Sequence, residues 1–377
     1  MHQVIFYPVG NGDTSQIVLE NNKRVLFDFR HTAKSENEEE PQIDLKQHLR
    51  DELKKAGRNY FDVVAFTHAD KDHIAGSTEF FELKHAEKYK GGDRIKISEL
   101  WVPAAMLLDR GTNEQQSDEF ILLRQEARHR LKQKEGILVF SAPPDLKKWM
   151  ADNDVDYESR KHLFVDAGTV VPGFSLASDS VEFFCHSPFI KHCDGGDIVR
   201  NDASLVLNIR FFTGNRYFDY LAVGDSTYGV LEDIVAITKY HKRDDRLAWD
   251  LFSIPHHCSY QALAPEKGDS VTVPTDGMAP LLLAGKKDAY IVSSSRPIPD
   301  TKEAYSQVQP PHIQARNAYE SYRDKIGARR FLVTMEEPNA YKPQPLIFEF
   351  TGDGHSWRKA AVTGSAAIIA SPPPRAG

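Results

Sequence analysis

A short apolar run that leads directly into four metal-ligating side chains is the feature that most constrains this chain. Residues 61–67 are largely apolar and predict a buried strand. The next six residues include His68, Asp70, Asp72 and His73, and imidazole and carboxylate groups are good ligands for zinc and manganese. On a tight loop the two pairs can point to two neighbouring metals, so the cluster predicts a two-metal site. The alternative, a solvated loop in which Asp72 caps a helix, leaves the two histidines beside a buried strand unexplained.

Two further strand ends carry ligand residues later in the chain. Residues 218–223 are followed closely by Asp225, and residues 251–255 are followed by His256 and His257. A carboxylate just past a strand end can bridge metals, and one of two adjacent histidines can ligate while the other orients it or contacts substrate. The sequence does not decide which of the two imidazoles faces inward. Each cluster alone could be a structural turn, but three clusters at strand ends reinforce one another.

Strand and helix patterns are mixed along the chain. Apolar runs and period-two patterns predict strands, and apolar residues at three- and four-residue spacing predict helices. The predicted strands are residues 3–9, 15–19, 24–29, 61–67, 181–185, 204–212, 217–223, 251–254, 289–293, 330–334 and 346–350, and the predicted helices are residues 43–56, 117–135, 144–151 and 230–241. Helices mixed with strands that end in polar clusters are typical of an αββα sandwich, in which helices flank two mixed β-sheets.

The domain organisation follows from the same patterns. No composition shift marks a linker, so we expect one hydrolase domain over residues 1–358. Charged helical patterns in the middle of the chain predict a helical insertion around residues 100–165. Residues 359–377 are small, apolar and rich in proline, and we expect this tail to be poorly ordered.

Composition narrows the setting of the protein. The 377-residue chain has a net charge of −7, which disfavours broad electrostatic binding to nucleic acid or an anionic membrane but leaves room for a local basic groove. Cys185, Cys193 and Cys258 are too few for a disulfide framework and fit a reducing compartment. We see neither a signal-like N-terminus nor a stretch of ~20 apolar residues, so we expect a cytoplasmic protein without a membrane segment.

The order of these motifs resembles the metallo-β-lactamase superfamily, and most of all the hydrolase domain of the ComEC/Rec2 competence proteins, which take up DNA. The resemblance runs from about residue 4 to residue 350. It is carried, in chain order, by Gly10-Asn11-Gly12-Asp13, Phe27-Asp28, His68-x-Asp70-x-Asp72-His73, His186-Ser187-Pro188, Asn201-Asp202-Ala203-Ser204, Gly224-Asp225 and His256-His257-Cys258-Ser259. It implies the metallo-β-lactamase αββα sandwich and a metallohydrolase with two divalent metal ions.

The chain departs from the superfamily pattern at three points. Asn201 and Asp202 stand where the superfamily usually has a histidine, so one of them takes that role or the first metal has an open position. Cys258 replaces the usual glycine, and we expect a small buried thiol there rather than a ligand. The membrane channel of the competence proteins has no counterpart in the chain, so we expect a stand-alone relative that does not import DNA.

The resemblance also implies a role for each site residue. The implied ligands are His68, Asp70 and Asp202 for the first metal, Asp72, His73 and His257 (or His256 in its place) for the second, and Asp225 as the bridge between them. The nucleophile would be a hydroxide that bridges the two metals, which places Asp72, His73 and Asp225 closest to the chemistry. Asp13 and Asp28 would orient ligands or brace the loop.

Metal-dependent hydrolysis of phosphodiesters, as in a nuclease, is the function that the sequence favours. This expectation rests on the resemblance to the competence proteins and on the carboxylate-rich ligand set, which suits manganese as well as zinc. Arg296 could hold a substrate phosphate, and the resemblance implies that His312 lies near the site mouth, where it could contact substrate. The alternatives are a hydrolase of a small ester, lactone or cyclic nucleotide, which suits the acidic net charge, and a catalytically silent partner subunit. The expected substrate is nucleic acid or a small phosphodiester, and analogy suggests a protein partner in a nucleic-acid-processing or defence system.

Overall fold

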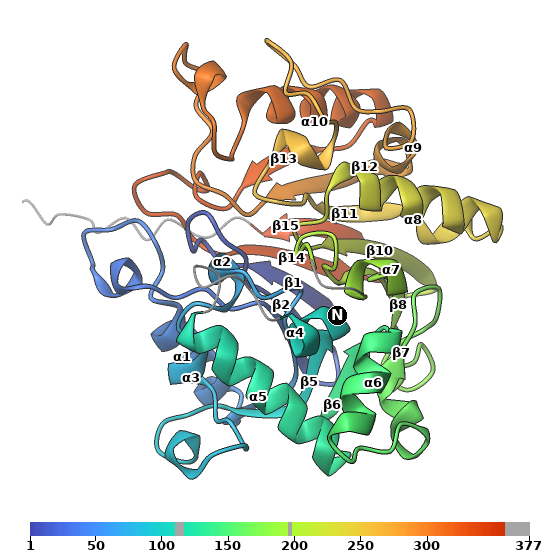
Figure 1. The fold of residues 1–377 in the computed structure, drawn as a ribbon. Helices are drawn as coiled ribbons and strands as arrows, with labels where there is room; N and C mark the ends of the chain where they lie inside the picture. The colour runs from blue at the N-terminus through green and yellow to red at the C-terminus, as the bar shows by residue number, and fades with distance from the viewer. Residues whose placement is uncertain (110–116, 195–197, 359–377) are drawn as a thin grey trace, which may run out of the picture.

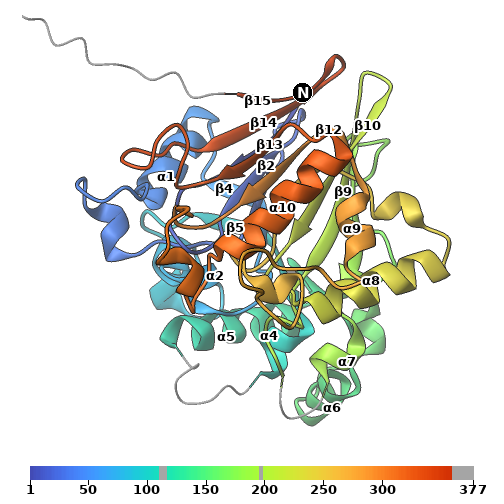
Figure 2. The same ribbon diagram turned by 90° about the horizontal axis from the view of Figure 1, so that it is seen from above.

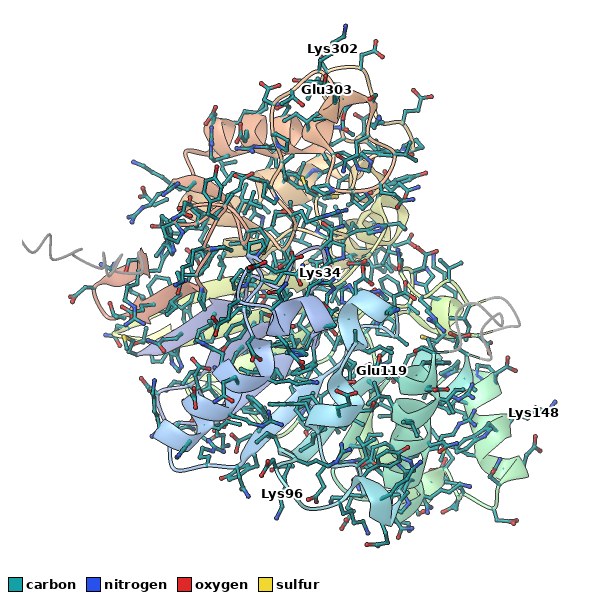
Figure 3. All side chains as sticks on the ribbon, turned by 90° about the vertical axis from the view of Figure 1, so that its left-hand side faces the viewer. Lys34, Lys96, Glu119, Lys148, Lys302 and Glu303 are labelled. Carbon is teal, nitrogen blue, oxygen red and sulfur yellow. The ribbon has the colours of Figure 1, made fainter. Side chains whose placement is uncertain are left out.

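The computed structural model describes residues 1–109, 117–194 and 198–358. In these residues two β-sheets lie face to face, and helices cover the outer face of each sheet (Figures 1 and 2). Exposed charged side chains such as Lys96, Lys148 and Lys302 project outward from the sandwich (Figure 3). The predicted αββα sandwich of two mixed sheets is therefore confirmed.

The first sheet changes from antiparallel to parallel pairing along its width. In spatial order it consists of β15 (Gly354–Arg358), β14 (Leu346–Thr351), β1 (His2–Phe6), β2 (Ser15–Val18), β3 (Arg24–Phe27), β4 (Tyr60–Ala65), β5 (Lys96–Pro103), β6 (Ile137–Phe140) and β7 (Phe164–Val165). Pairing is antiparallel from β15 to β3 and parallel from β3 to β7. The parallel strands need long crossover connections, and these connections carry the helices of one outer layer.

The second sheet is built on the same plan. In spatial order it consists of β13 (Arg330–Val333), β12 (Gly285–Ser293), β11 (Trp249–Ser253), β10 (Arg216–Val223), β9 (Val206–Thr213) and β8 (Val181–Ser187). Pairing is parallel from β13 to β10 and antiparallel from β10 to β8. Each sheet thus has a set of parallel strands whose carboxyl ends point to the same edge.

Helices occupy both outer layers. The α-helices are α1 (Leu45–Lys55), α2 (Lys71–Ile74), α3 (Ser77–Phe80), α4 (Ala104–Leu108), α5 (Asp118–Gln133), α6 (Pro144–Asp152), α7 (Ile190–Cys193), α8 (Tyr228–Tyr240), α9 (Ala279–Leu283) and α10 (Ile313–Ile326). Short 3-10 helices span Ala33–Glu36, Glu87–Tyr89, Glu158–Leu163, Asp244–Arg246, Tyr260–Ala262 and Ala304–Ser306. Apolar side chains of α1, α4, α5 and α6 pack on the first sheet, and those of α8, α9 and α10 pack on the second. Among the described residues, none of the helices combines the length and hydrophobicity that a bilayer crossing would require.

Side-chain alternation along the strands separates three apolar layers. In β1, Val4 and Phe6 are buried between the two sheets, whereas Ile5 between them packs against the outer helices. In β10, Tyr220 faces the layer between the sheets and Leu221 faces the helices of the second outer layer. Successive strand residues point to opposite faces, so both faces of each sheet are apolar and the strands read as continuous apolar runs.

Residues 100–165 differ from the predicted helical insertion. This segment contains α4, α5 and α6, but it also contains the second half of β5 together with β6 and β7, which extend the first sheet. The last two strands have four and two residues, too few for a clear strand pattern, while α5 dominates the charge pattern. The domain limits at residues 1 and 358 stay a prediction, and the predicted tail over residues 359–377 lies outside the described residues. All three cysteines are buried free thiols.

Candidate metal centre

The predicted site residues follow strand ends that meet at one edge of the sandwich. Asp28 follows β3, His68 follows β4, Asp225 follows β10, and His257 follows β11. Because β3 and β4 are parallel within the first sheet, and β10 and β11 within the second, the carboxyl ends of each pair lie side by side. Side-chain contacts join the carboxyl ends of β3 and β4 to those of β10 and β11, so the centre lies between the sheets.

A close backbone fit positions the loop that carries Asp72. The amide nitrogen of Asp13 donates to the carbonyl oxygen of Asp72 at 3.2 Å. A β-carbon on Gly12 would lie 2.6 Å from that same oxygen and 1.9 Å from Cδ of Arg30, so only glycine fits there. Asp72 and His73 lie on the four-residue helix α2. The loop is therefore held against the turn before β2.

A carboxylate behind the His73 ring fixes its orientation. His73 Nδ1 lies 2.7 Å from Asp28 Oδ2, and Asp28 also accepts hydrogen bonds from the amide and the hydroxyl of Thr67, each at 2.7 Å. Nε2 of His73 is thereby turned towards Asp225, whose Oδ1 lies 3.2 Å away. Burial lowers the pKa of His73, but the Asp225 and Asp28 carboxylates outweigh it and hold that pKa well above its usual value.

A backbone carbonyl plays the same part for His257. Its Nδ1 lies 2.9 Å from the carbonyl oxygen of Ser294, and because a carbonyl only accepts, Nδ1 carries the hydrogen and Nε2 faces the centre. Nε2 lies 3.1 Å from Asp72 Oδ2 and 3.7 Å from Asp225 Oδ2. Burial lowers the pKa of His257, but neighbouring carboxylates, with Asp225 the strongest, outweigh it and raise that pKa to about 9.

The turn after β11 separates the two adjacent histidines. His256, His257 and Cys258 have φ angles of 51°, 52° and 67°, three successive left-handed residues. The turn leaves the His257 side chain 1% exposed and the His256 side chain 21% exposed, with His256 Nε2 4.0 Å from Asp225 Oδ2. His257 is thus the inward imidazole and His256 lies at the rim. Burial raises the pKa of the Cys258 thiol, whose Sγ contacts the His312 carbonyl oxygen, so the thiol does not face the cluster.

Four candidate ligand side chains, with Asp225 among them, converge at the centre. One ligand atom from each of Asp13, His73, Asp225 and His257 lies within 4.8 Å of all the others. Nε2 of His73 and Oδ1 of Asp225 are buried and face each other at 3.2 Å, without a well-aligned hydrogen bond between them. Converging imidazole nitrogens and carboxylate oxygens are a normal ligand set for a divalent metal. These residues therefore fit a metal ion.

Asp13 lies among the candidate ligands, although the sequence suggested that it orients ligands or braces the loop. Its Oδ2 lies 3.8 Å from His73 Nε2 and 3.9 Å from His257 Nδ1, and burial raises the pKa of Asp13 to about 6. The pairing of β2 with β3 explains its place. The two strands are antiparallel, so the residues before β2 lie at the same edge as the residues after β3.

Asp72 lies at the open side of the cluster. Its side chain is 37% exposed, and its carboxylate pairs with His257 Nε2. Burial raises the pKa of Asp72, but the hydrogen bond from His257 and the charge of His73 outweigh it and hold that pKa below its usual value. The Arg30 guanidinium also interacts electrostatically with Asp72 and with Arg296.

The other predicted ligands are arranged differently. His68 Nε2 lies 3.6 Å from Asp70 Oδ2 and 3.8 Å from Asp225 Oδ2 and, although buried, makes no hydrogen bond within the described residues. Asp70 Oδ1 forms an ion pair with Arg200 at 3.0 Å. Asp202 accepts a hydrogen bond from Thr227 Oγ1 at 2.7 Å. The structure thus brings His68 to Asp225 but gives the two aspartates other partners.

The two predicted substrate residues differ in what they contact. His312 is 1% exposed, its Nε2 lies 3.0 Å from the Val308 carbonyl oxygen, and its Nδ1 lies 3.4 Å from the amide nitrogen of Tyr260. Because both ring nitrogens contact backbone, His312 braces two loops rather than presenting a nitrogen to substrate. Arg296 is exposed, and its amide donates to Asn11 Oδ1 at 3.3 Å, beside the turn before β2.

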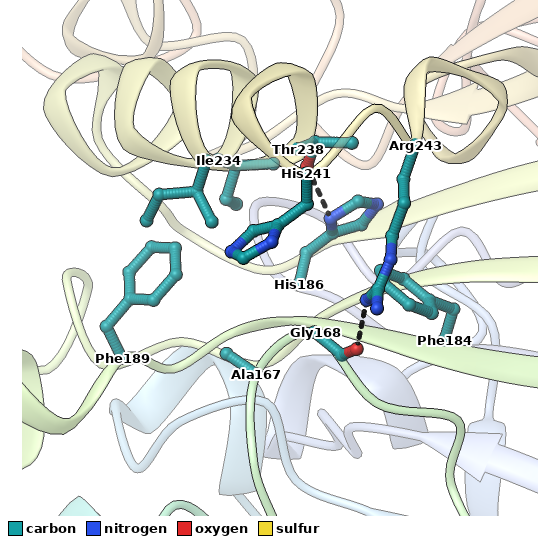
Figure 4. Close-up of a pocket in the computed structure, with 10 residues that line it drawn as sticks. Ala167, Gly168, Phe184, His186, Phe189, Ile234, Thr238, His241 and Arg243 are labelled. Carbon is teal, nitrogen blue, oxygen red and sulfur yellow. Dashed lines mark hydrogen bonds between the residues drawn. The ribbon is translucent and has the colours of Figure 1, made fainter.

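The structure also has a cavity whose lining includes none of the cluster residues. It has a volume of about 290 Å³ between β8 and α8 and is lined by Phe184, His186, Thr238 and Arg243 among others (Figure 4). His186 Nε2 lies 2.9 Å from the carbonyl oxygen of Arg246, and burial lowers the pKa of His186 to about 4. The motif that begins at His186 therefore belongs to this cavity and not to the metal cluster.

No family model and no curated protein matches the chain. Among solved structures, it is similar to a protein of Parabacteroides distasonis described as a candidate metal-dependent hydrolase, with a TM-score of 0.35 and 10% identity over 87% of this chain and 91% of that one. It is similar to the long form of RNase Z from yeast, with a TM-score of 0.35 and 12% identity over 88% of this chain and 36% of that one. Zn²⁺-bound PqqB from Methylobacterium extorquens gives a TM-score of 0.33 and 11% identity over 92% of this chain and 99% of that one. Likenesses this distant carry no argument about family or activity.

Proposed function

We propose that the protein is a metal-dependent hydrolase and that its substrates are phosphodiesters, as for a nuclease. The observation that carries the proposal is the convergence of Asp13, His73, Asp225 and His257, whose ligand atoms lie within 4.8 Å of one another. A largely buried set of two imidazoles and two carboxylates whose ligand atoms face one another is an ordinary binding site for a divalent cation. The ligand set would suit zinc or manganese.

His73, His257, Asp225 and Asp13 would hold the metal ion. A bound divalent ion supplies a Lewis acid for a substrate oxygen and lowers the pKa of a water bound to it. Asp28 and the Ser294 carbonyl keep the two imidazoles in the tautomer that presents Nε2, because each engages Nδ1. The chain's own contribution is a ligand set whose orientation is fixed before the ion arrives.

Asp72 is the group best placed to orient a water at the open side. Its carboxylate is partly exposed, lies 3.1 Å from His257 Nε2, and has a pKa below its usual value. The low pKa keeps this carboxylate ionised, so it can accept a hydrogen bond from an attacking water and hold it in place rather than act as a strong base. The Arg30 guanidinium interacts electrostatically with Asp72 and with Arg296, and guanidinium groups suit the negative charge of a phosphodiester.

A small substrate is the second candidate. The net charge of −7 favours a small ester, lactone or cyclic nucleotide over a long nucleic acid, which would require a basic groove. A two-metal centre, a cytoplasmic location and a protein partner in a nucleic-acid-processing or defence system stay predictions from the sequence. The intact ligand set argues against a catalytically silent subunit.

Cleavage assays would test the proposal. Single- and double-stranded DNA, RNA and a small phosphodiester would be incubated with the protein and manganese or zinc. We expect metal-dependent cleavage that Asp72→Ala abolishes while the fold is kept, because Asp72 is partly exposed at the cluster rim. The matched control is Asp353→Ala in the exposed turn between β14 and β15. Cleavage of the small phosphodiester alone would select the second candidate, and full activity in Asp72→Ala would reject the role given to Asp72.

A further inference from the structure

A buried guanidinium stands beside the residues that the sequence assigns to a first metal. Arg200 is 8% exposed, its Nη1 lies 3.0 Å from Asp70 Oδ1 and donates to the Ala69 carbonyl oxygen at 3.1 Å, and its Nε lies 2.6 Å from Asp109 Oδ2. The guanidinium carbon lies 4.5 Å from the centre of the Phe120 ring. Four separate contacts therefore hold the cation in place.

The ligands predicted for that metal are engaged elsewhere. One oxygen of Asp70 is taken by Arg200, and Asp202 Oδ1 accepts from Thr227 Oγ1 at 2.7 Å. In the described part of the chain, the carboxylates paired with His68 are Asp70 and Asp225. A metal at this position would have three candidate ligands, namely His68, the second carboxylate oxygen of Asp70, and the Asp225 carboxylate that it shares with the other side. We call His68, Asp70, Asp109, Arg200 and Asp202 the Arg200 side of the centre.

We propose that the centre holds one metal ion and that Arg200 supplies the positive charge that a first metal would supply. The inference rests on the proposed metal-dependent function. An arginine guanidinium stays protonated at every accessible pH, and like charges repel strongly in a poorly solvated site. Arg200, which pairs with both Asp70 and Asp109, therefore occupies Oδ1 of Asp70 with a permanent positive charge and opposes a divalent ion next to it.

The proposal separates the two kinds of histidine in the centre. His257 and His73 have Nδ1 engaged by Ser294 O and Asp28 and would bind the single ion through Nε2. His68 would be a positioning residue, with Nε2 3.8 Å from the Asp225 carboxylate, and not a ligand. Replacing His68 should then leave the metal content unchanged, whereas replacing His257 should remove the ion.

Metal content is the measurement that tests this inference. The full chain would be loaded with Mn²⁺, dialysed, and analysed by mass spectrometry of the metal, titration calorimetry and electron paramagnetic resonance. We expect one ion per chain with the signal of an isolated ion, one ion in His68→Gln, and none in His257→Gln. Two ions per chain with an exchange-coupled signal would overturn the inference and leave the hydrolase proposal standing, whereas no bound ion would reject the hydrolase proposal itself.

Variants of the Arg200 side sharpen the test. Arg200→Gln removes the charge, and we expect a second, weaker binding event to appear in the titration. Arg200→Gln also removes the ion pair between Arg200 and the buried Asp109. Asp70→Asn keeps Arg200 and is the second variant, so the test does not depend on the folding of Arg200→Gln. Asp70→Asn should still bind one ion with unchanged affinity, and loss of metal in that variant would show that Asp70 is a ligand.

Discussion

The Asp225 carboxylate separates two sides of the centre that contain the same residue types. On the His257 side, defined by Asp13, Asp72, His73 and His257, the rings of His73 and His257 are fixed from behind and point Nε2 at Asp225. On the Arg200 side the predicted ligands Asp70 and Asp202 are held by a guanidinium and a hydroxyl. Both sides contain histidine and aspartate, so composition does not distinguish them.

The difference lies in what stands behind each candidate ligand. An acceptor behind an imidazole Nδ1 sets the tautomer and leaves the opposite nitrogen free for a metal. A cation beside a carboxylate has the opposite effect, because it takes up the charge that would attract a metal. The residues behind the ligands therefore decide which side can bind an ion.

The largest expected difference is between two Asp→Asn changes, one at Asp225 and one at Asp70 on the Arg200 side. Asp225→Asn should reduce kcat/KM by roughly 10³-fold or more and remove the metal, because the Asp225 carboxylate lies within 3.8 Å of the imidazoles of His68, His73 and His257. Asp70→Asn should leave the metal affinity unchanged and reduce kcat/KM by less than about tenfold. Steady-state kinetics and metal analysis would check both variants, and equal losses would contradict the difference between the sides.

Metal affinity should depend on pH through the His257 side. Because the pKa of His257 is raised to about 9 and that of His73 is also held well above its usual value without metal, the ion must displace a proton from each imidazole, and Kd should fall by roughly 100-fold per pH unit below pH 9. In the metal-free protein the His257 proton contributes stability below the unfolded pKa of about 6.5, and this stability is lost as pH rises through 9. Titration calorimetry between pH 6 and 9 would measure the slope. A flat profile would mean that His257 binds no metal.

Asp28→Asn tests the support behind one ligand. The change keeps the shape of the side chain but removes the charge that orients His73 through Nδ1. We expect the metal Kd to rise by roughly 10–100-fold with little change in the overall fold. Asp109→Asn is the matched control on the other side, since Asp109 contacts Arg200. Comparable losses of affinity in the two variants would show that both sides support a metal.

The strand ends and most candidate ligand positions could be predicted from the sequence, because apolar runs that end in polar residues are local signals. Asp28, His68, Asp225 and His257 all follow strands whose last residues are largely apolar. Asp13 is different, since its place depends on the antiparallel pairing of β2 with β3. Only this pairing brings Asp13, which precedes β2, to the same edge of the sheet as Asp28, which follows β3.

The engagement of Asp70 could not be predicted from the sequence. Arg200 lies 130 positions further along the chain, and nothing in a one-dimensional pattern pairs a single arginine with one of several aspartates. His312 shows the same limit, because the family resemblance suggested a substrate contact but both ring nitrogens contact backbone groups. Long-range partners, and not residue type, determine the role of such a side chain.

Thr227→Val gives the smallest and most specific test of the Arg200 side. The hydroxyl of Thr227 donates to Asp202 at 2.7 Å, and it makes no cap hydrogen bond to α8, which begins at the next residue. The change therefore removes one hydrogen bond, which should lower the free energy of unfolding by about 1 kcal/mol and leave the metal content at one ion. Thr169→Val, which removes a hydroxyl donor to the Asp166 carbonyl outside the centre, is the control. If Thr227→Val alone bound a second ion, Asp202 would be a ligand restrained by Thr227, and the hydroxyl rather than the guanidinium would be what separates the two sides.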